Sequence, residues 1–280
     1  MRLPLAWLVV LPFFLYAIAF LFFPAAKVLF GAFQSTDGGY TLANLEEITK
    51  EPHRTDFKTS IEVSLVTALL GGALGFLIAY SMIRDGTPKF FRAAFTTFSG
   101  VASQFAGIPL AFAFIATAGT IGTVTRFLAS LGYDPYQHGF TLFSKVGVEM
   151  VYLYFQIPLM ILVIAPAIDG LKREWREAAS NLGATPRQFW LHVGLPVLTP
   201  SLLGAVVLLF GNSFAAYATA YGLTGGSVPL VPIRIGFYVS GDVLSNPHLA
   251  QALALGMFIV LAAMMAIYVP LQRVSSRWVK

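Results

Sequence analysis

Uncharged polar side chains interrupt two long apolar runs of this 280-residue chain, at positions where they could contact a polar solute. Ser213, Tyr217 and Tyr221 recur at every fourth residue, and Asn212 adjoins them. A continuous helix would place the first three on one face. Gln104 interrupts the other run. Amide and hydroxyl groups exchange hydrogen bonds with a solute, and aromatic faces attract cations, so this set suits binding rather than bond cleavage.

Two carboxylates, Glu62 and Glu149, lie near the ends of apolar runs. With Tyr217 and Tyr221 they could hold an organic cation such as a polyamine. The alternative is structural, because tyrosine favours the membrane interface, serine and asparagine bond across packed helices, and glutamate near a helix end reaches water. With that alternative open, we predict a solute path lined by Gln104, Glu149, Asn212, Ser213, Tyr217 and Tyr221.

Covalent chemistry is not indicated by the sequence. The chain has no cysteine, which excludes disulfides and thiolate metal sites, and its four histidines lie at unrelated spacings, so we predict no metal site. It contains no G-x-x-x-x-G-K-[ST] loop to bind a nucleotide phosphate. The net charge of +5 is spread in short groups beside apolar runs, which does not favour nucleic acid. We therefore expect no catalysis and no cofactor in this chain.

The composition is that of a membrane protein. Hydrophobic residues make up 57% of the chain and charged residues only 11%, whereas soluble domains have about 25% charged residues. Six apolar stretches approach or exceed the roughly 20 helical residues needed to cross a hydrocarbon core. They are approximately 5–30, 60–83, 92–116, 146–168, 197–221 and 249–271. We predict an all-α integral membrane protein with one transmembrane domain over residues 1–280.

The positions of lysine and arginine predict the orientation. If both termini and the second and fourth loops are cytoplasmic, most basic residues lie on the inner side, as the positive-inside rule requires. The inner set is Arg2, Arg84, Lys89, Arg92, Lys172, Arg173, Arg176, Arg187, Arg273, Arg277 and Lys280. The outer loops hold Lys50, Arg54, Lys58, Arg126 and Arg234. We expect a multi-pass protein of the inner membrane with both termini in the cytoplasm.

Three further patterns concern packing. The connection 117–145 has turn chemistry and predicts loop or short helix. Residues 222–247 mix glycine, proline and apolar residues, which predicts a re-entrant or surface-lying segment packed on protein. Gly71 and Gly75 form a G-x-x-x-G pattern that predicts close helix packing.

Residues 174–196 separate the fourth and fifth predicted spans and carry signals for helix ends. Gly183 stands where a first short helix would stop, because glycine readily adopts the left-handed conformation. Thr185, Pro186 and Gln188 are typical of an N-cap, a first-turn proline and a capping-box partner. Two short helices are therefore predicted to meet at an angle near Gly183.

This segment could offer a docking surface to a partner outside the bilayer. It presents a carboxylate, Glu177, and the apolar side chains of Ala178, Ala179 and Leu182, beside Gly183. The alternative is a linker that lies among the lipid headgroups, as amphipathic helices with aromatic residues often do.

The segment resembles the EAA signature of permease subunits in prokaryotic ATP-binding-cassette importers of type I. The matching positions are Glu177, Ala178, Ala179, Gly183, Leu195 and Pro196. The resemblance implies a six-span permease fold and a coupling helix, between spans four and five, that inserts into a groove on an ATPase. Residues 40–48, YTLANLEEI, are similar to a stretch common in these permeases. The layout is most similar to the spermidine/putrescine type, whose relatives carry ferric iron, thiamine or aminophosphonates.

The resemblance also implies partners and a solute. The partners are an ATPase dimer that binds ATP and Mg²⁺, a second permease subunit in a heterodimer, an external solute-binding protein and membrane lipid. The solute would be small, and a polyamine on this resemblance. Two other classes were weighed. A stand-alone secondary transporter should have inverted repeats and ionisable groups at mid-membrane, and a membrane-embedded enzyme should have a catalytic cluster. The sequence has no clear sign of either.

Overall fold

The computed structural model describes residues 6–35, 37–83, 88–240 and 246–275. Within these ranges the chain forms helices and connecting loops, with one isolated bridge between Gln34 and Tyr40. Six helices are long and apolar enough to cross a membrane. They are Val10–Gly31, His53–Met82, Ile108–Ser130, Lys145–Asp169, Pro186–Phe214 and Pro247–Arg273. The prediction of an all-α membrane protein with six such helices is confirmed.

Some positions used in the sequence argument lie outside the described residues. They are the predicted start of the first span at residue 5 and the basic residues Arg2, Arg84, Arg277 and Lys280.

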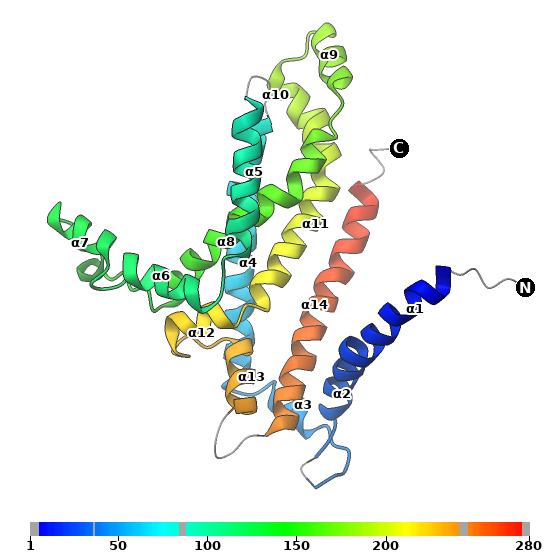
Figure 1. The fold of residues 1–280 in the computed structure, drawn as a ribbon, viewed down its shortest axis with the longest axis vertical. Coiled ribbons are helices and arrows are strands. Elements are labelled where there is room, and N and C mark those ends of the chain that lie inside the picture. The colour runs from blue at the N-terminus through cyan, green and yellow to red at the C-terminus, as the bar shows by residue number, and fades with distance from the viewer. Residues whose placement is uncertain (1–5, 36, 84–87, 241–245, 276–280) are drawn as a thin grey trace, which may run out of the picture.

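The first span stands at one side of the bundle. It consists of α1 (Ala6–Ala17), the π-helical turn η1 (Ile18–Phe22) and α2 (Phe23–Gly31). It slants beside α14 (Pro247–Ser275), which it contacts through α2 (Figure 1). Most of its phenylalanines are exposed. Such a surface suits hydrocarbon, because lipid tails are as apolar as the side chains that face them.

The core of the bundle lies between α14 and three other long helices. These are α4 (His53–Ile83), α8 (Lys145–Asp169) and α11 (Leu195–Phe214), the last packed between α4 and α14. Their contact layer is apolar and includes the fully buried Met160, Ile164 and Leu209.

Helices α4 and α8 approach closely because glycine removes side chains from their interface. A Cβ at Gly71 would lie 2.8 Å from the Gln156 Cβ. A Cβ at Gly75 would lie 2.6 Å from the Met160 Cβ and 2.7 Å from the Ile157 carbonyl oxygen. The predicted packing role of this G-x-x-x-G pattern is confirmed.

Replacing Gly75 with alanine is therefore expected to destabilise the bundle. The added methyl group meets backbone as well as side chain, so the helices must separate, at a cost of about 1–3 kcal/mol. Thermal unfolding in detergent should show a lower Tm. Gly211→Ala is the matched control, since its Cβ would be 3.7 Å from its nearest neighbour, an ordinary contact. Equal midpoints for the two variants would contradict the packing argument.

The third predicted span, 92–116, is two helices rather than one. α5 (Lys89–Gln104) and α6 (Ile108–Ala118) are separated by residues 105–107, where Gly107 has a φ of +79°. α5 runs along α8. α6 and the following α7 (Thr123–Ser130), which together make up the membrane-capable segment Ile108–Ser130, extend to one side of the bundle (Figure 1). The prediction of one continuous span was wrong here. The rest of the connection 117–145 holds α7 and the 3-10 turn η2 (Pro135–His138), as predicted.

The fifth predicted span, 197–221, is shifted towards the N-terminus. Helical turns run without interruption from α10 (Pro186–Phe189) through the π-helical turn η3 (Trp190–Gly194) into α11. α11 ends at Phe214, and α12 (Ala218–Thr224) follows after residues 215–217. The predicted continuation to residue 221 was therefore wrong.

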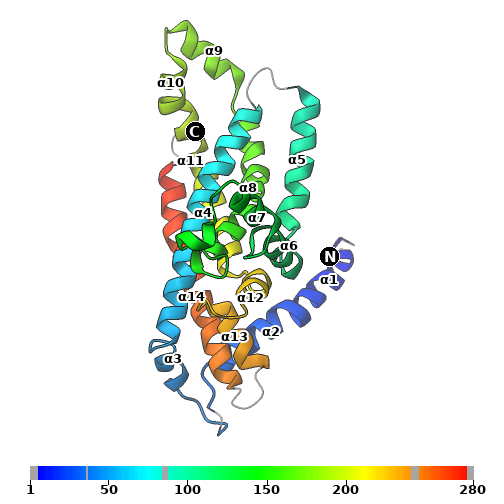
Figure 2. The ribbon, with the colours of Figure 1, turned by 90° about the vertical axis from the view of Figure 1, so that its left-hand side faces the viewer.

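The two ends of the bundle carry different short helices. Figure 2 shows α9 (Arg173–Asn181) and α10 at one end, and α3 (Ala43–Glu47) and α13 (Val231–Ser240) at the other. α13 packs on α4 and α14. This confirms that the stretch 222–247 contains a segment packed on protein, although residues 241–245 lie outside the described part.

A buried ion pair fixes α13 to the start of α4. Asp56 is fully buried and accepts hydrogen bonds from Arg234 Nε at 2.8 Å and from its Nη2 at 3.1 Å. The hydrogen bond with Asp56 raises the pKa of Arg234 above its usual range. The buried His53 lies beside Asp56, with 3.5 Å between Nδ1 and the carboxylate. α4 therefore begins at His53, seven residues before the predicted start of the second span at residue 60.

Candidate functional site

The helix α9 ends at a glycine in the left-handed conformation. Gly183 has a φ of +79°, and its N–H donates to the Ser180 carbonyl at 2.9 Å. The Ala184 N–H donates to the Ala179 carbonyl at 2.9 Å. These bonds satisfy carbonyl groups that a helix end leaves open. The predicted helix end at Gly183 is confirmed.

A capping box starts the next helix immediately. The Thr185 N–H donates to Gln188 Oε1 at 2.8 Å, and the Gln188 N–H donates to Thr185 Oγ1 at 3.3 Å, with Pro186 in the first turn. The predicted cap is confirmed, but the second helix is not short. It continues through η3 into α11, so the end of α9 is joined directly to the fifth span.

The predicted docking residues form an exposed surface at the tip of this segment. We call Glu177, Ala178, Ala179, Leu182 and Gly183 the docking surface. The Leu182 side chain is 88% exposed, and Glu177 is held by Arg173, whose Nε donates to Oε1 at 2.9 Å. Both views place α9 beyond the ends of the long helices (Figures 1 and 2). The surface is therefore reachable from outside the bundle.

Aromatic side chains anchor this segment to α4. Phe189 is buried, and the Trp190 ring meets the Tyr80 ring edge to face with 4.5 Å between centroids. A Cβ at Gly194 would lie 2.7 Å from the Trp190 ring, so glycine is required where the π-helical turn passes that ring. Sequence reasoning missed Tyr80, because no local pattern marks its contact with Trp190, 110 positions away. It also missed Gly194, although Gly194 lies only four residues from Trp190.

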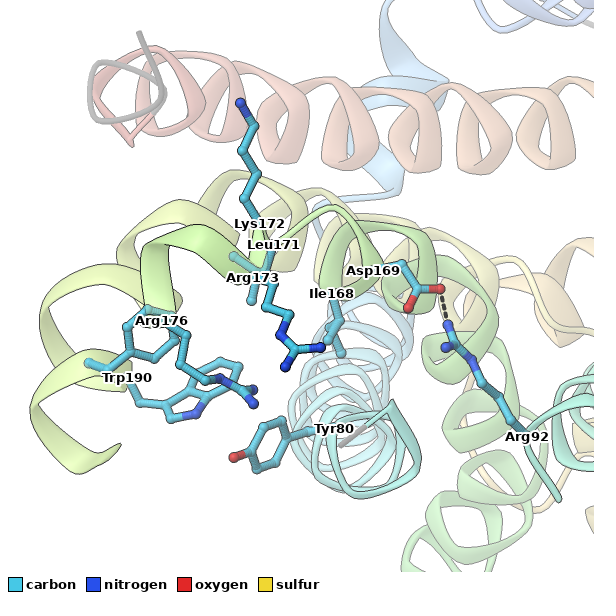
Figure 3. Close-up of a pocket in the computed structure, with 10 residues that line it drawn as sticks. Tyr80, Arg92, Ile168, Asp169, Leu171, Lys172, Arg173, Arg176 and Trp190 are labelled. Carbon is cyan, nitrogen blue, oxygen red and sulfur yellow. Dashed lines mark hydrogen bonds and ion pairs between the residues drawn. The ribbon is translucent and has the colours of Figure 1, made fainter. Parts of the chain in front are cut away.

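A pocket of about 180 Å³ lies between α9 and the neighbouring ends of α4, α5 and α8. Arg92, Arg173 and Arg176 line it, and we call it the arginine pocket. Arg92 is paired with Asp169 across its mouth (Figure 3). Asp169 is the last residue of α8 and so lies just before the segment that begins with α9.

Two helix breaks meet on the far side of the core. The Gly107 N–H, between α5 and α6, donates to Thr219 Oγ1 of α12 at 2.7 Å. The Tyr152 hydroxyl of α8 donates to the Ala216 carbonyl, between α11 and α12, at 2.7 Å. Beside these breaks is a cavity of about 330 Å³, which we call the break cavity.

The break cavity is lined by three of the predicted path residues, Gln104, Asn212 and Tyr217. Asn212 Nδ2 donates to Gln156 Oε1 at 3.3 Å, and the fully buried Gln156 donates in turn to the Leu209 carbonyl at 2.7 Å. A buried amide thus orients Asn212. Among the described residues that line the cavity there is no Asp, Glu, Lys or Arg, so its polar groups are neutral.

The other predicted path residues lie elsewhere. Ser213 is buried and shares a hydrogen bond of 2.9 Å with Thr67 of α4. The expectation that Ser213, Tyr217 and Tyr221 share one helical face was wrong, because α11 ends before Tyr217. The two tyrosines stack on each other with 5.4 Å between ring centroids, but Tyr221 is not among the described lining residues.

The carboxylates are also away from the break cavity. Glu62 of α4 accepts a hydrogen bond from Lys145 Nζ of α8 at 2.5 Å. Glu149 lies one helical turn from Lys145, outside the described lining of the cavity. Glu62 thus forms an ion pair between two helices, a role that the sequence analysis had not considered for it.

A bundle of membrane-capable helices with an exposed two-helix segment at one end and a polar cavity at two helix breaks has the architecture of a transporter's membrane subunit. The model of one family, described as binding-protein-dependent transport system inner membrane component, matches residues 71–280. The chain belongs to this family. It is thus a multi-pass inner-membrane protein of the ATP-binding-cassette permease type.

Curated relatives match at low identity. The chain is 28% identical over 175 residues to a probable sulfate transport system permease of Nephroselmis olivacea, covering 62% of this chain and 58% of that protein. It is 28% identical over 164 residues to the molybdenum transport system permease ModB of Mycobacterium tuberculosis, covering 58% and 56% respectively. The chain spans about three fifths of the length of these curated relatives.

Solved structures match over nearly the whole chain. A chain of a bacterial transporter involved in the import of the acidic polysaccharide alginate has a TM-score of 0.75 at 17% identity, covering 96% of this chain and 95% of that chain. A second structure of a bacterial alginate transporter, in complex with a periplasmic protein that holds an alginate pentasaccharide, has a TM-score of 0.72 at 18% identity, covering 94% and 92%. These likenesses show the fold.

Proposed function

We propose that this protein is the permease subunit of an ATP-driven importer, in which it moves a small solute from an external binding protein into the cytoplasm. The docking surface carries the proposal. It pairs an 88% exposed leucine with a helix end fixed by Gly183, within the part of the chain that the family model matches. A groove on a partner protein would bury this side chain, as the apolar side chains at the centre of protein interfaces are buried.

The proposed partners follow from that role. An ATPase dimer, which binds ATP and Mg²⁺, docks at α9, and this chain itself catalyses no reaction. A second permease subunit, in a heterodimer, completes the membrane path, and a solute-binding protein docks at the end that carries α3 and α13. In this arrangement both termini are cytoplasmic. The alginate transporter bound to its periplasmic protein supports the external partner by likeness of fold.

Co-purification tests the proposed role. The tagged protein, solubilised gently from its native membrane, should carry with it a P-loop ATPase that mass spectrometry identifies, and Gly183→Arg should lose that ATPase while remaining in the membrane. Failure to recover any ATPase under conditions that preserve membrane complexes would favour a stand-alone secondary transporter.

We propose a small oxyanion as the solute. Gln104, Asn212 and Tyr217 line the break cavity, and their neutral amide and hydroxyl groups are of types that can donate hydrogen bonds to such an anion. Relatives named for sulfate and molybdenum transport support this choice. The competing hypothesis is a polyamine, which the sequence resemblance favoured. It is weaker because Glu62 is already paired with Lys145 and neither Glu62 nor Glu149 is among the described residues lining the cavity.

Competition for uptake separates the two solutes. Cells that express the complete system should take up labelled sulfate, and unlabelled molybdate should reduce that uptake. Competition by spermidine or putrescine, with none by either oxyanion, would restore the polyamine hypothesis. Competition only by a ferric complex, thiamine or an aminophosphonate would exclude both.

A further inference from the structure

A buried glutamine stands behind the wall of the break cavity. Gln156 of α8 is fully buried, and its Nε2 donates a hydrogen bond of 2.7 Å to the Leu209 carbonyl of α11. Its Oε1 accepts a hydrogen bond of 3.3 Å from Asn212 Nδ2, and Asn212 is exposed at the lining of the cavity. Gln156 is itself outside the described lining, so it acts on the cavity through the Asn212 side chain.

The order of donors and acceptors in these two bonds leaves one arrangement of the amides. A backbone carbonyl can only accept a hydrogen bond, so the amide nitrogen of Gln156 must face Leu209 and its oxygen must face Asn212. An amide oxygen also only accepts, so Asn212 must present its nitrogen to Gln156. The carbonyl oxygen of Asn212 and one of its two N–H groups are then left over for a solute. The backbone of α11 thus determines which way the Asn212 amide faces.

Packing holds Gln156 itself in place. A Cβ at Gly71 of α4 would lie 2.8 Å from the Gln156 Cβ, so α4 and α8 are in close contact there. Met160, one helical turn further along α8, is also fully buried. An amide among such side chains is stable only when its polar atoms are hydrogen-bonded, which Leu209 and Asn212 provide.

We propose that Gln156 is a positioning residue for solute passage: it holds the Asn212 amide in one orientation at the break cavity and does not contact the solute itself. The inference rests on the proposed function, because it requires the break cavity to be part of the solute path. It does not depend on whether the solute is an oxyanion or a polyamine. An amide that is already oriented can bond a solute without the entropic cost of ordering a free side chain.

Uptake by cells that express the complete system tests this role. The probe is labelled sulfate, or labelled spermidine if the competition experiment favours the polyamine, at a saturating concentration. Gln156→Met keeps a side chain of similar length and volume but has no amide. It should lower the uptake rate, normalised to the protein in the membrane fraction, about fivefold, the factor that corresponds to about 1 kcal/mol.

A double-mutant cycle separates positioning from a role in the fold. Asn212→Ala should lower the uptake rate at least as far as Gln156→Met, because it removes the amide that faces the solute. If Gln156 acts through Asn212, the variant with both changes should be no slower than Asn212→Ala alone. Gln156→Asn is a second variant in case Gln156→Met does not accumulate in the membrane. Its shorter amide keeps the polarity but cannot reach both partners, so it should behave in the same way.

Thr67→Val is the matched control. Thr67 of α4 is fully buried and shares a hydrogen bond of 2.9 Å with Ser213, the residue next to Asn212, but neither Thr67 nor Ser213 is among the described residues that line the break cavity. Like Gln156→Met, this variant removes a buried hydrogen bond between two helices, so the two should lower the Tm in detergent by similar amounts. The uptake rate of Thr67→Val should stay close to that of the unmodified protein.

The outcomes distinguish this inference from the proposed function. Losses that multiply in the double variant, or an equal loss of uptake in Thr67→Val, would show that Gln156 acts on the fold and would overturn the proposal. Normal transport by Asn212→Ala, with transport lost in the docking-surface variant Leu182→Arg, would overturn it while the importer role stands. Normal transport by Leu182→Arg, with no further loss in the double variant, would support the positioning role and contradict the docking of an ATPase.

Discussion

Leu182→Arg is expected to reduce solute uptake at least about 30-fold while the protein remains inserted in the membrane. The Leu182 side chain is 88% exposed, so the change costs the fold little. In the proposed complex the same side chain is buried in an ATPase groove, where a central apolar contact is worth 2 kcal/mol or more, or about 30-fold in affinity. The measurement is uptake of labelled solute, normalised to the amount of protein in the membrane fraction.

Leu182→Met is the control for this prediction, because it keeps an apolar side chain of similar volume. It should retain most of the uptake. Unchanged transport by Leu182→Arg would contradict docking at this surface and favour the linker alternative, in which α9 lies among lipid headgroups.

Arg234→Met is expected to produce the largest loss of stability among single changes at the end of the bundle that carries α3 and α13. Asp56 is fully buried and accepts two hydrogen bonds from the Arg234 guanidinium, so this change leaves a buried carboxylate without its cation. Removing one partner of a buried pair costs about 3–5 kcal/mol, and the partial exposure of Arg234 reduces this to about 2–3 kcal/mol. Thermal unfolding should show a lower Tm, and limited proteolysis should cut first near α13.

Arg54→Met provides the comparison, since Arg54 is an exposed arginine on the same helix. It should change stability by about 0.5 kcal/mol or less. A similar Tm for the two methionine variants would show that the ion pair does not hold α13 in place.

The 174–196 segment could be predicted because its signals are local. A glycine that ends one helix and a capping box that starts the next depend only on residues within four positions of each other. The structure has both, at Gly183 and at Thr185 with Gln188. What the segment contacts could not be predicted, since Tyr80 reaches Trp190 from a distant part of the chain.

The helix breaks could not be predicted from apolar runs. Residues 105–107 and 215–217 continue the hydrophobic pattern, and the second break contains neither glycine nor proline. The first break does carry local signals, namely Gly107 with its φ of +79° and Pro109 in the first turn of α6. The second break has only a tertiary bond, from Tyr152 to the Ala216 carbonyl. Because the helical period was extended through the second break, Ser213 and Tyr217 were predicted to share one face, which was wrong. Gln104 and Asn212 nevertheless line the same cavity.

At the start of α4, polar residues that hydropathy leaves outside the span belong to the buried part of the helix. His53 and Asp56 are polar and therefore looked like loop residues, but both are buried. The burial of Asp56 is compensated by Arg234, 178 positions away, which supplies the opposite charge. Hydropathy cannot recognise a polar residue whose partner is remote in sequence.

The uninterrupted helical run Pro186–Phe214 connects the docking surface with the break cavity. Its 29 residues extend about 43 Å at 1.5 Å per residue. One tip begins next to Gly183, and the other carries Asn212 at the rim of the break cavity. The edge-to-face contact between Trp190 and Tyr80 fixes this helical run to α4 near its first end. In the proposed importer, a displacement of α9 by a docked ATPase would therefore reach the cavity wall along one continuous helical run.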